Sequence, residues 1–348
     1  MAVTLTDISE IAGVSVSTVS RVLNGKSEKH RISADTQQKV IAAAERLNYR
    51  PNELARGLRL QKTHTIGLIV PDISNPFFAN ISRSIQVQAY ENGYSTLVAN
   101  TDENIETEIE QIKLLRSKGV DGFVIMPVGL ESAHIKELLS ENTPLVLLDR
   151  CFDDLNTNSV VVNNFKGAYM ATEHLIKNGH SRISIIQGLR NTSTNNSRVA
   201  GYKQALNDYG IPISTSLIVG KSFGQKSGYL ETKLLLNLDD PPSAIFATSD
   251  LITLGVFHAV YEEGLSIPDH ISIVSFDDVD FGAFLAAPLT AIAQPKDLMG
   301  EMAVKLLLED IDQNGAAKKS RIVLKPELIQ RNSVRYIKEI KTIEKPAG

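Results

Sequence analysis

The sequence lacks the features of secreted, membrane-embedded and disulfide-bonded proteins. Cys151 is the only cysteine among 348 residues, which excludes an intramolecular disulfide and a cysteine-based zinc site. The longest apolar runs, such as residues 66–70, are far shorter than the roughly 20 residues that cross a bilayer. The segment MAVTLTDISE has neither the basic nor the apolar region of a secretion signal. We therefore expect a cytoplasmic protein with no membrane partner.

Signatures of enzymes are also missing. No G-x-G-x-x-G follows a predicted strand, and there is no G-x-x-x-x-G-K-[ST] loop or nucleophile-elbow motif. His30 lies near the N-terminus, and the other histidines are scattered without paired metal spacing: His64, His134, His174, His180, His258 and His270. We expect no catalysis, no cofactor and no metal site.

The charge is distributed unevenly along the chain. Residues 1–62 hold ten Lys/Arg and six Asp/Glu, a net charge of +4, whereas the remainder has a net charge of −8. A basic segment on an acidic body indicates that the segment binds a polyanion. At 348 residues with 43% hydrophobic content, the chain is expected to form two or three globular domains.

The first 50 residues predict three short helices. The T-x-x-D pattern at residues 4–7 resembles a capping box, and Gly13 ends that helix. Ser15 can cap a second helix that stops at Asn24-Gly25, and Ser33 can cap a third. Two helices joined by so tight a turn, with a third to complete the core, form a helix-turn-helix arrangement.

The second of these helices has a polar face suited to the major groove. Ser17, Arg21 and Asn24 are spaced i, i+4, i+7, and Val16 lies at the N-terminal edge. Arg21 can pair bidentately with guanine, Ser17 can donate or accept, and Val16 can contact a thymine methyl. Phosphate contacts, some of which are alternatively helix caps, are predicted for five residues: Thr4, Ser15, Thr18, Ser20 and Asn24.

A short linker follows. Pro51 ends the preceding segment, and Asn52 can cap a helix of about two turns with Leu54 and Leu58 on one face. So short a helix containing a glycine is marginal in water. We expect it to become helical only against a partner.

From Thr65 onward, apolar runs alternate with helical patterns. The runs are TIGLIV, TLVAN, GFVIM, LVLLD, VVVN, ISIIQ, AIFAT, ISIVSFD and LTAIAQ. Runs of this kind predict parallel strands buried on both faces in an α/β fold, and their number predicts two lobes.

Ligands of such sheets bind outside the carboxyl ends of the strands. The polar and aromatic candidates there are Asp72, Asn75, Phe77, Phe78, Asp149, Arg150, Arg198, Phe223, Ser249, Asp250, Asp277 and Gln294. Carboxylates, amides and arginines bind vicinal hydroxyls in pairs, and phenyl rings stack on sugars, so the set favours a neutral polyol.

Several segments together resemble the lactose-repressor family of bacterial transcription regulators. They are TLTDISEIAGVSVSTVSRVLNG, ERLNYRPNELARGLR, IGLIVPDISNPFF, TSDLITLG, SFDD and IAQP. The resemblance runs from about residue 3 to residue 336. It implies that Val16, Ser17 and Arg21 contact bases and that Leu58 of a hinge helix wedges into the minor groove. It also implies that Asn52, Ala55 and Arg59 belong to this hinge, with Ala55 allowing close approach of two hinge helices.

The resemblance also implies a domain organisation. We expect an α/β protein with a three-helix helix-turn-helix head at 1–50, a hinge helix at 51–63, a two-lobed periplasmic-binding-protein-like core at 64–336, and a tail at 337–348. The first lobe is expected at about 64–161 and 293–325, and the second at about 162–292 and 326–336. In the core, the strongest transfers from sugar-responsive relatives are Asn75, Phe77, Arg150, Arg198, Asp277 and Gln294. Ser249 departs from the asparagine common at its position, which leaves the sugar open.

The predicted function is a repressor of sugar-utilisation genes, nucleoid-associated in the bacterial cytoplasm. Its partners would be double-stranded DNA with a palindromic operator, a small sugar-like effector between the lobes, and a second copy in a homodimer. Helical residues 75–92 and 250–263 are interface candidates. Two alternatives remain open: a global catabolite regulator controlled by a phosphorylated protein partner, and a sugar-binding protein without a DNA role. Whether the effector releases DNA or promotes its binding is also open.

Overall fold

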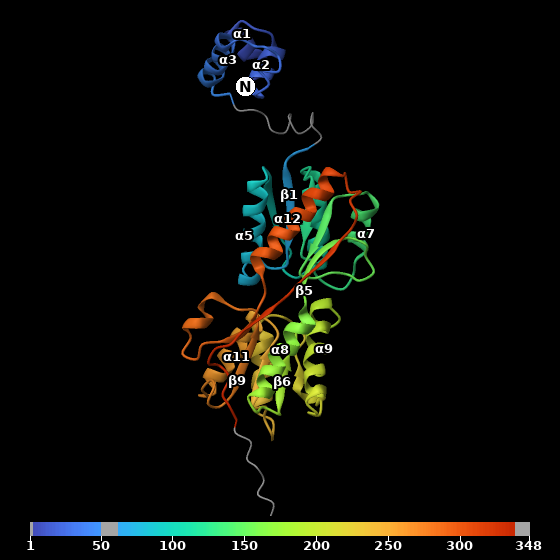
Figure 1. Cartoon of the computed structure of the whole chain (residues 1–348), viewed down its shortest axis with the longest axis vertical. Helices are drawn as coiled ribbons and strands as arrows, with labels where there is room; N and C mark the ends of the chain where they lie inside the picture. Colours follow the sequence, from blue (N-terminus) through green and yellow to red (C-terminus); the bar gives the residue numbers. More distant parts are fainter. Residues whose placement is uncertain (1–2, 50–61, 338–348) are drawn as a thin grey trace, which may run out of the picture. The chain divides into compact units, whose positions relative to one another are not determined.

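The computed structural model describes residues 3–49 and 62–337, and the chain divides into two compact units at residues 1–63 and 64–348 (Figure 1). The predicted hinge residues Asn52, Ala55, Leu58 and Arg59 lie outside the described residues, as does nearly all of the predicted tail. In the described part of the chain, no helix is long and apolar enough to cross a membrane.

The N-terminal unit contains three helices, α1 (Leu5–Ala12), α2 (Val16–Leu23) and α3 (Ala34–Arg46). Local sequence determines their ends. Thr4 and Asp7 form a complete capping box on α1, and Gly13 ends that helix with a φ of +64°. The side chains of Ser15 and Ser33 cap α2 and α3. The small core between the three helices is formed by Ile8, Val19, Val22, Val40, Ala43 and Ala44.

The second unit is built on two sheets of six strands each. The first has the order β11-β5-β4-β3-β1-β2, and its strands are β1 (Thr65–Val70), β2 (Ser95–Asn100), β3 (Gly122–Ile125), β4 (Leu145–Leu148), β5 (Asn158–Val162) and β11 (Arg321–Leu324). The second has the order β12-β10-β9-β8-β6-β7, and its strands are β6 (Ile183–Ile186), β7 (Ile218–Val219), β8 (Ala244–Ala247), β9 (Ser272–Phe276), β10 (Thr290–Ala293) and β12 (Glu327–Ile329). All neighbouring strands are parallel except β10 and β12.

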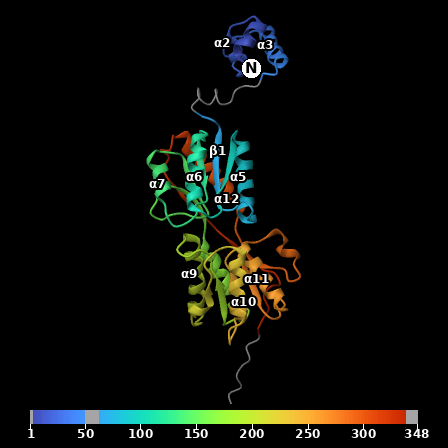
Figure 2. The same cartoon turned by 180° about the vertical axis from the view of Figure 1, so that it is seen from behind.

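Helices cover both faces of each sheet. The first sheet carries α5 (Pro76–Glu91), α6 (Ile105–Ser117), α7 (Ala133–Ser140) and α12 (Lys296–Asp312). The second carries α8 (Asn164–Lys177), α9 (Ser193–Asp208), α10 (Gln225–Leu236) and α11 (Asp250–Glu262), with single 3-10 turns at Thr215–Leu217 and Asp280–Phe284. Alternate residues of β1 belong to different cores: Leu68 packs with α5 and α12, whereas Ile69 packs with α6 and α7. Figures 1 and 2 show these opposite faces.

The chain passes between the two lobes three times. It leaves the first sheet after Val162 for α8, returns after Ala293 for α12, and crosses again between Leu324 and Glu327. Each lobe is therefore assembled from segments distant in sequence. The carboxyl ends of strands from both sheets then face one shared cavity.

Candidate functional site

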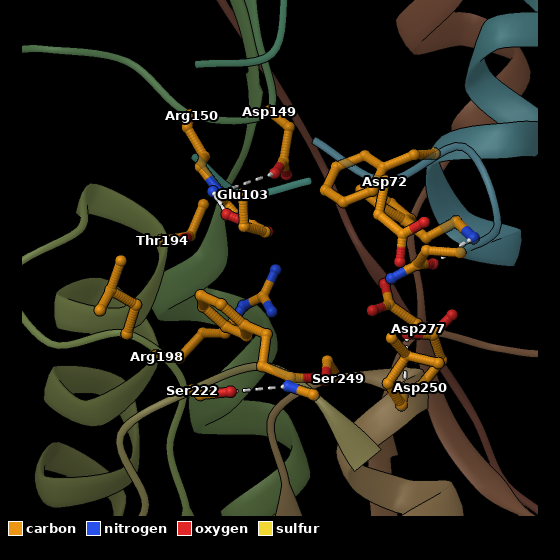
Figure 3. A pocket seen from close by; sticks show the side chains of 17 residues that line it. Asp72, Glu103, Asp149, Arg150, Thr194, Arg198, Ser222, Ser249, Asp250 and Asp277 are labelled. Carbon is orange, nitrogen blue, oxygen red and sulfur yellow. Dashed lines mark hydrogen bonds and ion pairs between the residues drawn. The ribbon is translucent and has the colours of Figure 1, made fainter. Parts of the chain in front are cut away.

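A cavity of about 310 Å³ lies between the lobes and is lined from both sides (Figure 3). The first lobe contributes Asp72, Asn75, Phe77, Phe78, Glu103, Asp149 and Arg150. The second contributes Leu189, Thr194, Arg198, Ser222, Phe223, Gly224, Ser249, Asp250, Leu251 and Asp277. The structure thus places eleven of the twelve predicted effector residues on one surface.

Gln294 is the predicted residue that does not line this cavity. Its side-chain Nε2 donates to Oδ1 of Asp277 at 2.5 Å, so it orients a lining carboxylate instead. Arg198 reaches the cavity by a different route from the one predicted. It lies in the first half of α9 and not directly after a strand.

Some lining residues were missed by the sequence reasoning. Glu103 and Thr194 follow strands that the pattern did predict, β2 and β6, so a wider search of the following loops could have found them. Ser222 and Gly224 follow β7, a two-residue edge strand that has no recognisable apolar run. Phe223, which lies between them, was predicted, so its two neighbours could have been found by extending the search to the whole loop.

Two predicted residues combine lining with capping. Asn75 caps α5, since its Oδ1 accepts from the backbone N–H of Phe77 at 2.8 Å. Pro76 at the first turn suits that position because its missing N–H would have no partner there. Ser249 caps α11, and its hydroxyl also donates to the carbonyl of Phe223 at 3.1 Å. Asn75 and Ser249 therefore each cap a helix and line the cavity, and the amide nitrogen of Asn75 can donate to a ligand.

Three buried carboxyl groups face the cavity, those of Asp149, Asp250 and Asp277. Burial raises the pKa of Asp149 to about 6, against the opposing charges of Arg198 and Arg150. Burial, together with the negative charge of Asp277, raises the pKa of Asp250 to about 6. Oδ1 of Asp149 and Oδ2 of Asp250 have no hydrogen-bond partner among the described residues. These buried oxygens can accept hydrogen bonds from a bound hydroxylated molecule.

The two arginines have different surroundings. Arg150 donates two hydrogen bonds to the carboxylate of Glu103, at 2.8 and 2.7 Å. Arg198 donates to Oδ1 of Asn164 at 2.8 Å and to the carbonyl of Thr248 at 2.6 Å. Its Cζ lies 3.7 Å from the centroid of the Phe276 ring, and Figure 3 shows the guanidinium projecting into the middle of the cavity. Arg198 is therefore a donor directed at any occupant.

The head presents the second predicted site. Val16 is 41% exposed, and Ser17, Arg21 and Asn24 are exposed on the same helix. Desolvation, followed by the positive charges of Arg21, Lys29 and Lys26, lowers the pKa of the exposed His30. The end of α2 and the turn after it thus concentrate the basic charge of the head, as a surface for a polyanion requires.

The predicted phosphate-contacting residues also make caps. Thr4 is engaged in the capping box of α1. The hydroxyl of Ser15 lies 2.9 Å from the hydroxyls of both Ser17 and Thr18 and accepts from the Thr18 N–H. Asn24 donates to the carbonyl of Ser20 at 2.6 Å. These groups are therefore oriented by local hydrogen bonds while remaining at least partly exposed to solvent.

Comparisons with known proteins cover nearly the whole chain. Residues 4–52 match the model for bacterial regulatory proteins of the lacI family, and residues 63–339 match periplasmic binding proteins and the sugar binding domain of the LacI family. The HTH-type transcriptional repressor PurR of Haemophilus influenzae (strain PittEE) is 36% identical, over 96% of this chain and 99% of that protein. The ribose operon repressor of H. influenzae (strain Rd) is 35% identical, over the same shares of the two chains. The Lac repressor dimer, solved bound to operator and the anti-inducer ONPF, superposes with a TM-score of 0.84 at 29% identity, over 96% of this chain and all of that one.

Proposed function

Because the chain belongs to the LacI family of bacterial transcriptional regulators, we propose that it represses sugar-utilisation genes under the control of a neutral monosaccharide. The observation that carries this proposal is the cavity between the lobes, with its buried carboxylates and phenylalanine rings. The protein acts by binding operator DNA and the effector, without catalysing a reaction, in the bacterial cytoplasm, where operators are found.

The chemistry of the lining favours a polyhydroxylated effector. Carboxylate oxygens such as those of Asp149 and Asp250 accept hydrogen bonds from hydroxyl groups, and Arg198 donates to them. The rings of Phe77 and Phe78 offer apolar surface for the C–H face of a sugar. A volume of about 310 Å³ is near the lower end for small-molecule pockets, which suits one sugar ring.

The charge of the lining argues against an anionic effector. Five carboxylates and two guanidinium groups line the cavity, which gives a formal charge of −3 when all are ionised. A phosphate would meet this excess of like charge, whereas a neutral sugar would not. A flat nucleobase is the second candidate, because the rings of Phe77, Phe78 and Phe223 surround the cavity and could stack on it.

For DNA recognition, we assign direct base contacts to Val16, Ser17 and Arg21 of α2. Their exposure on one helix face supports this assignment. Phosphate contacts belong to Thr4, Ser15, Thr18, Ser20 and Asn24. Asn52, Ala55, Leu58 and Arg59 form the minor-groove hinge, with Leu58 as the wedge. Palindromic operators suit a two-fold symmetric homodimer.

Effector and operator are coupled through closure of the two lobes. The three connections between the lobes allow them to rotate about the cavity that both line. A lobe rotation changes the spacing of paired heads in a dimer. By linkage, an effector that binds one lobe arrangement more tightly must alter operator affinity, and the operator must alter effector affinity by the same factor.

A thermal-shift screen of the full chain tests the effector class. The panel contains D-ribose and other pentoses, hexoses, their phosphate esters, and purine bases and nucleosides. We expect a rise in Tm with at least one neutral sugar and none with the phosphate esters. A rise with purines alone would overturn the sugar assignment and favour the nucleobase.

A further inference from the structure

Arg150 is a buried cation whose charge is already satisfied within the protein. It is 5% exposed, and its Nη1 and Nη2 each donate to one carboxylate oxygen of Glu103. Its Cζ lies 5.9 Å from the ring centroid of Phe78 and 5.3 Å from that of Phe223, one ring from each lobe. Burial alone would lower the pKa of Arg150, but the hydrogen bonds and charge of Glu103, together with the charges of Asp149 and Glu108, raise it.

Glu103 is held in place by a strained turn between β2 and α6. Asp102 and Glu103 have φ angles of +52° and +55°, a left-handed conformation that non-glycine residues rarely adopt. The turn is tied down on both sides: the Glu103 N–H donates to the carbonyl of Pro71 at 3.0 Å, and Asn100 donates to Asp102 at 2.5 Å. Two adjacent strained residues persist only when their surroundings over-determine them, and such strain collects at functional sites.

Arg150 binds Glu103 through two hydrogen bonds in the same bidentate geometry with which arginine binds phosphate. A guanidinium binds carboxylate or phosphate through two parallel N–H donors, and Glu103 occupies both. Its other contacts are weaker, since Nη1 lies 3.4 Å from the Pro127 carbonyl and Nε lies 4.0 Å from Asp149. An anionic ligand that paired with Arg150 would have to displace Glu103 and leave a carboxylate beside its own charge.

We infer that Glu103 is a specificity-determining residue, which neutralises Arg150 and makes the cavity reject phosphorylated and other anionic sugars. The inference rests on the proposed function of this cavity as the effector site. Glu103 lines the cavity and acts by accepting hydrogen bonds from both terminal nitrogens of Arg150. The regulator then responds to the free sugar and not to the ester that a sugar-phosphorylating reaction forms from it.

The test compares the wild-type full chain with Glu103→Gln, which keeps the side-chain size and removes the charge. Isothermal titration with D-ribose and D-ribose 5-phosphate gives the ratio of their affinities. We expect the wild-type chain to prefer D-ribose by at least about tenfold, and Glu103→Gln to reduce that preference by about tenfold. The matched control is Glu106→Gln, an exposed carboxylate in the first turn of α6 outside the cavity lining, and its ratio should equal that of the wild-type chain.

Inorganic phosphate is a second probe, independent of which sugar binds. Phosphate should raise the Tm of Glu103→Gln and leave those of the wild-type and Glu106→Gln chains unchanged. An unchanged sugar ratio, or equal phosphate responses in all three chains, would overturn the role of Glu103 while leaving the sugar effector standing. If the wild-type chain bound no sugar at all, the proposed effector would fail, and the phosphate responses would still decide the role of Glu103.

Discussion

Replacing Asp149 by asparagine should stabilise the free protein and abolish effector binding. Asp149 is 5% exposed, its Oδ1 has no hydrogen-bond partner among the described residues, and burial raises its pKa from 3.8 to about 6. The ionised carboxylate therefore destabilises the fold. Asparagine has the same shape and no charge, and it tolerates the φ of +64° that Asp149 adopts.

The magnitude follows from the pKa difference. A rise from 3.8 to about 6 corresponds to about 3 kcal/mol, at about 1.4 kcal/mol per pKa unit. Because the folded-state pKa is raised, this cost is full above pH about 6 and declines as the pH falls toward 3.8. At roughly 2–4 °C for each kcal/mol, Asp149→Asn should raise Tm by roughly 6–12 °C at pH 8. At pH 5 the gain should fall to about half of that value.

The assay is thermal unfolding of both full chains between pH 5 and 8, without sugar and with D-ribose. The exposed Glu106→Gln variant should show no pH-dependent difference from the wild-type chain. In Asp149→Asn, a neutral sugar that raises the wild-type Tm should no longer do so, since an oxygen acceptor in the cavity has been altered. A gain that is constant with pH, or a lower Tm at pH 8, would refute the reasoning, because Asp149 would then be a well-paired charge.

Three further predictions concern the head, the cavity and the packing of the second lobe. Arg21→Ala should weaken binding to a selected operator by about 1–3 kcal/mol in fluorescence anisotropy, and an equal loss on unrelated DNA would contradict base reading. Asp277→Asn should lose the Tm response to D-ribose while keeping operator binding; retained sugar binding would remove Asp277 from the effector site. Gly255→Ala places a methyl 2.1 Å from the carbonyl of Gln225 on the neighbouring α10, so unfolding should become easier by about 1–3 kcal/mol in urea titration. Gly224→Ala, whose methyl meets only the Ser222 hydroxyl at 3.4 Å, is the control and should cost less stability than Gly255→Ala.

The fold was predictable where each element carries its own pattern. Strands such as Gly122–Ile125 and Leu145–Leu148 are buried on both faces, so they read as continuous apolar runs. Three strands escaped prediction: Ile218–Val219, Arg321–Leu324 and Glu327–Ile329. They lie at sheet edges and none of their residues is fully buried, so they lack such runs. An edge strand forms because a neighbouring strand lies close enough to pair with it. The sequence pattern of the edge strand alone does not reveal that neighbour.

The candidate site was predictable to the extent that one rule located it. Asn75 and Asp277 come just after buried strands, so the rule that ligands meet the carboxyl ends of parallel strands pointed to them. The same rule misplaced Gln294, which follows a strand but is turned onto Asp277. It also overlooked Glu103, whose importance appears only beside Arg150.

Local sequence set the bounds of the three head helices and the positions of the buried strands, because capping residues and apolar runs act over a few neighbouring residues. It also determined the family, and with it the pairing of a DNA-binding head with an effector-binding core. Which charges are paired and which face the cavity depends on contacts between residues far apart in the chain. Glu103 and Arg150 are 47 residues apart, and their contact depends on two loops meeting at one sheet edge. The packing of the whole lobe brings such residues within hydrogen-bonding distance, and these short distances in space determine the hydrogen bonds and the pKa values of the site.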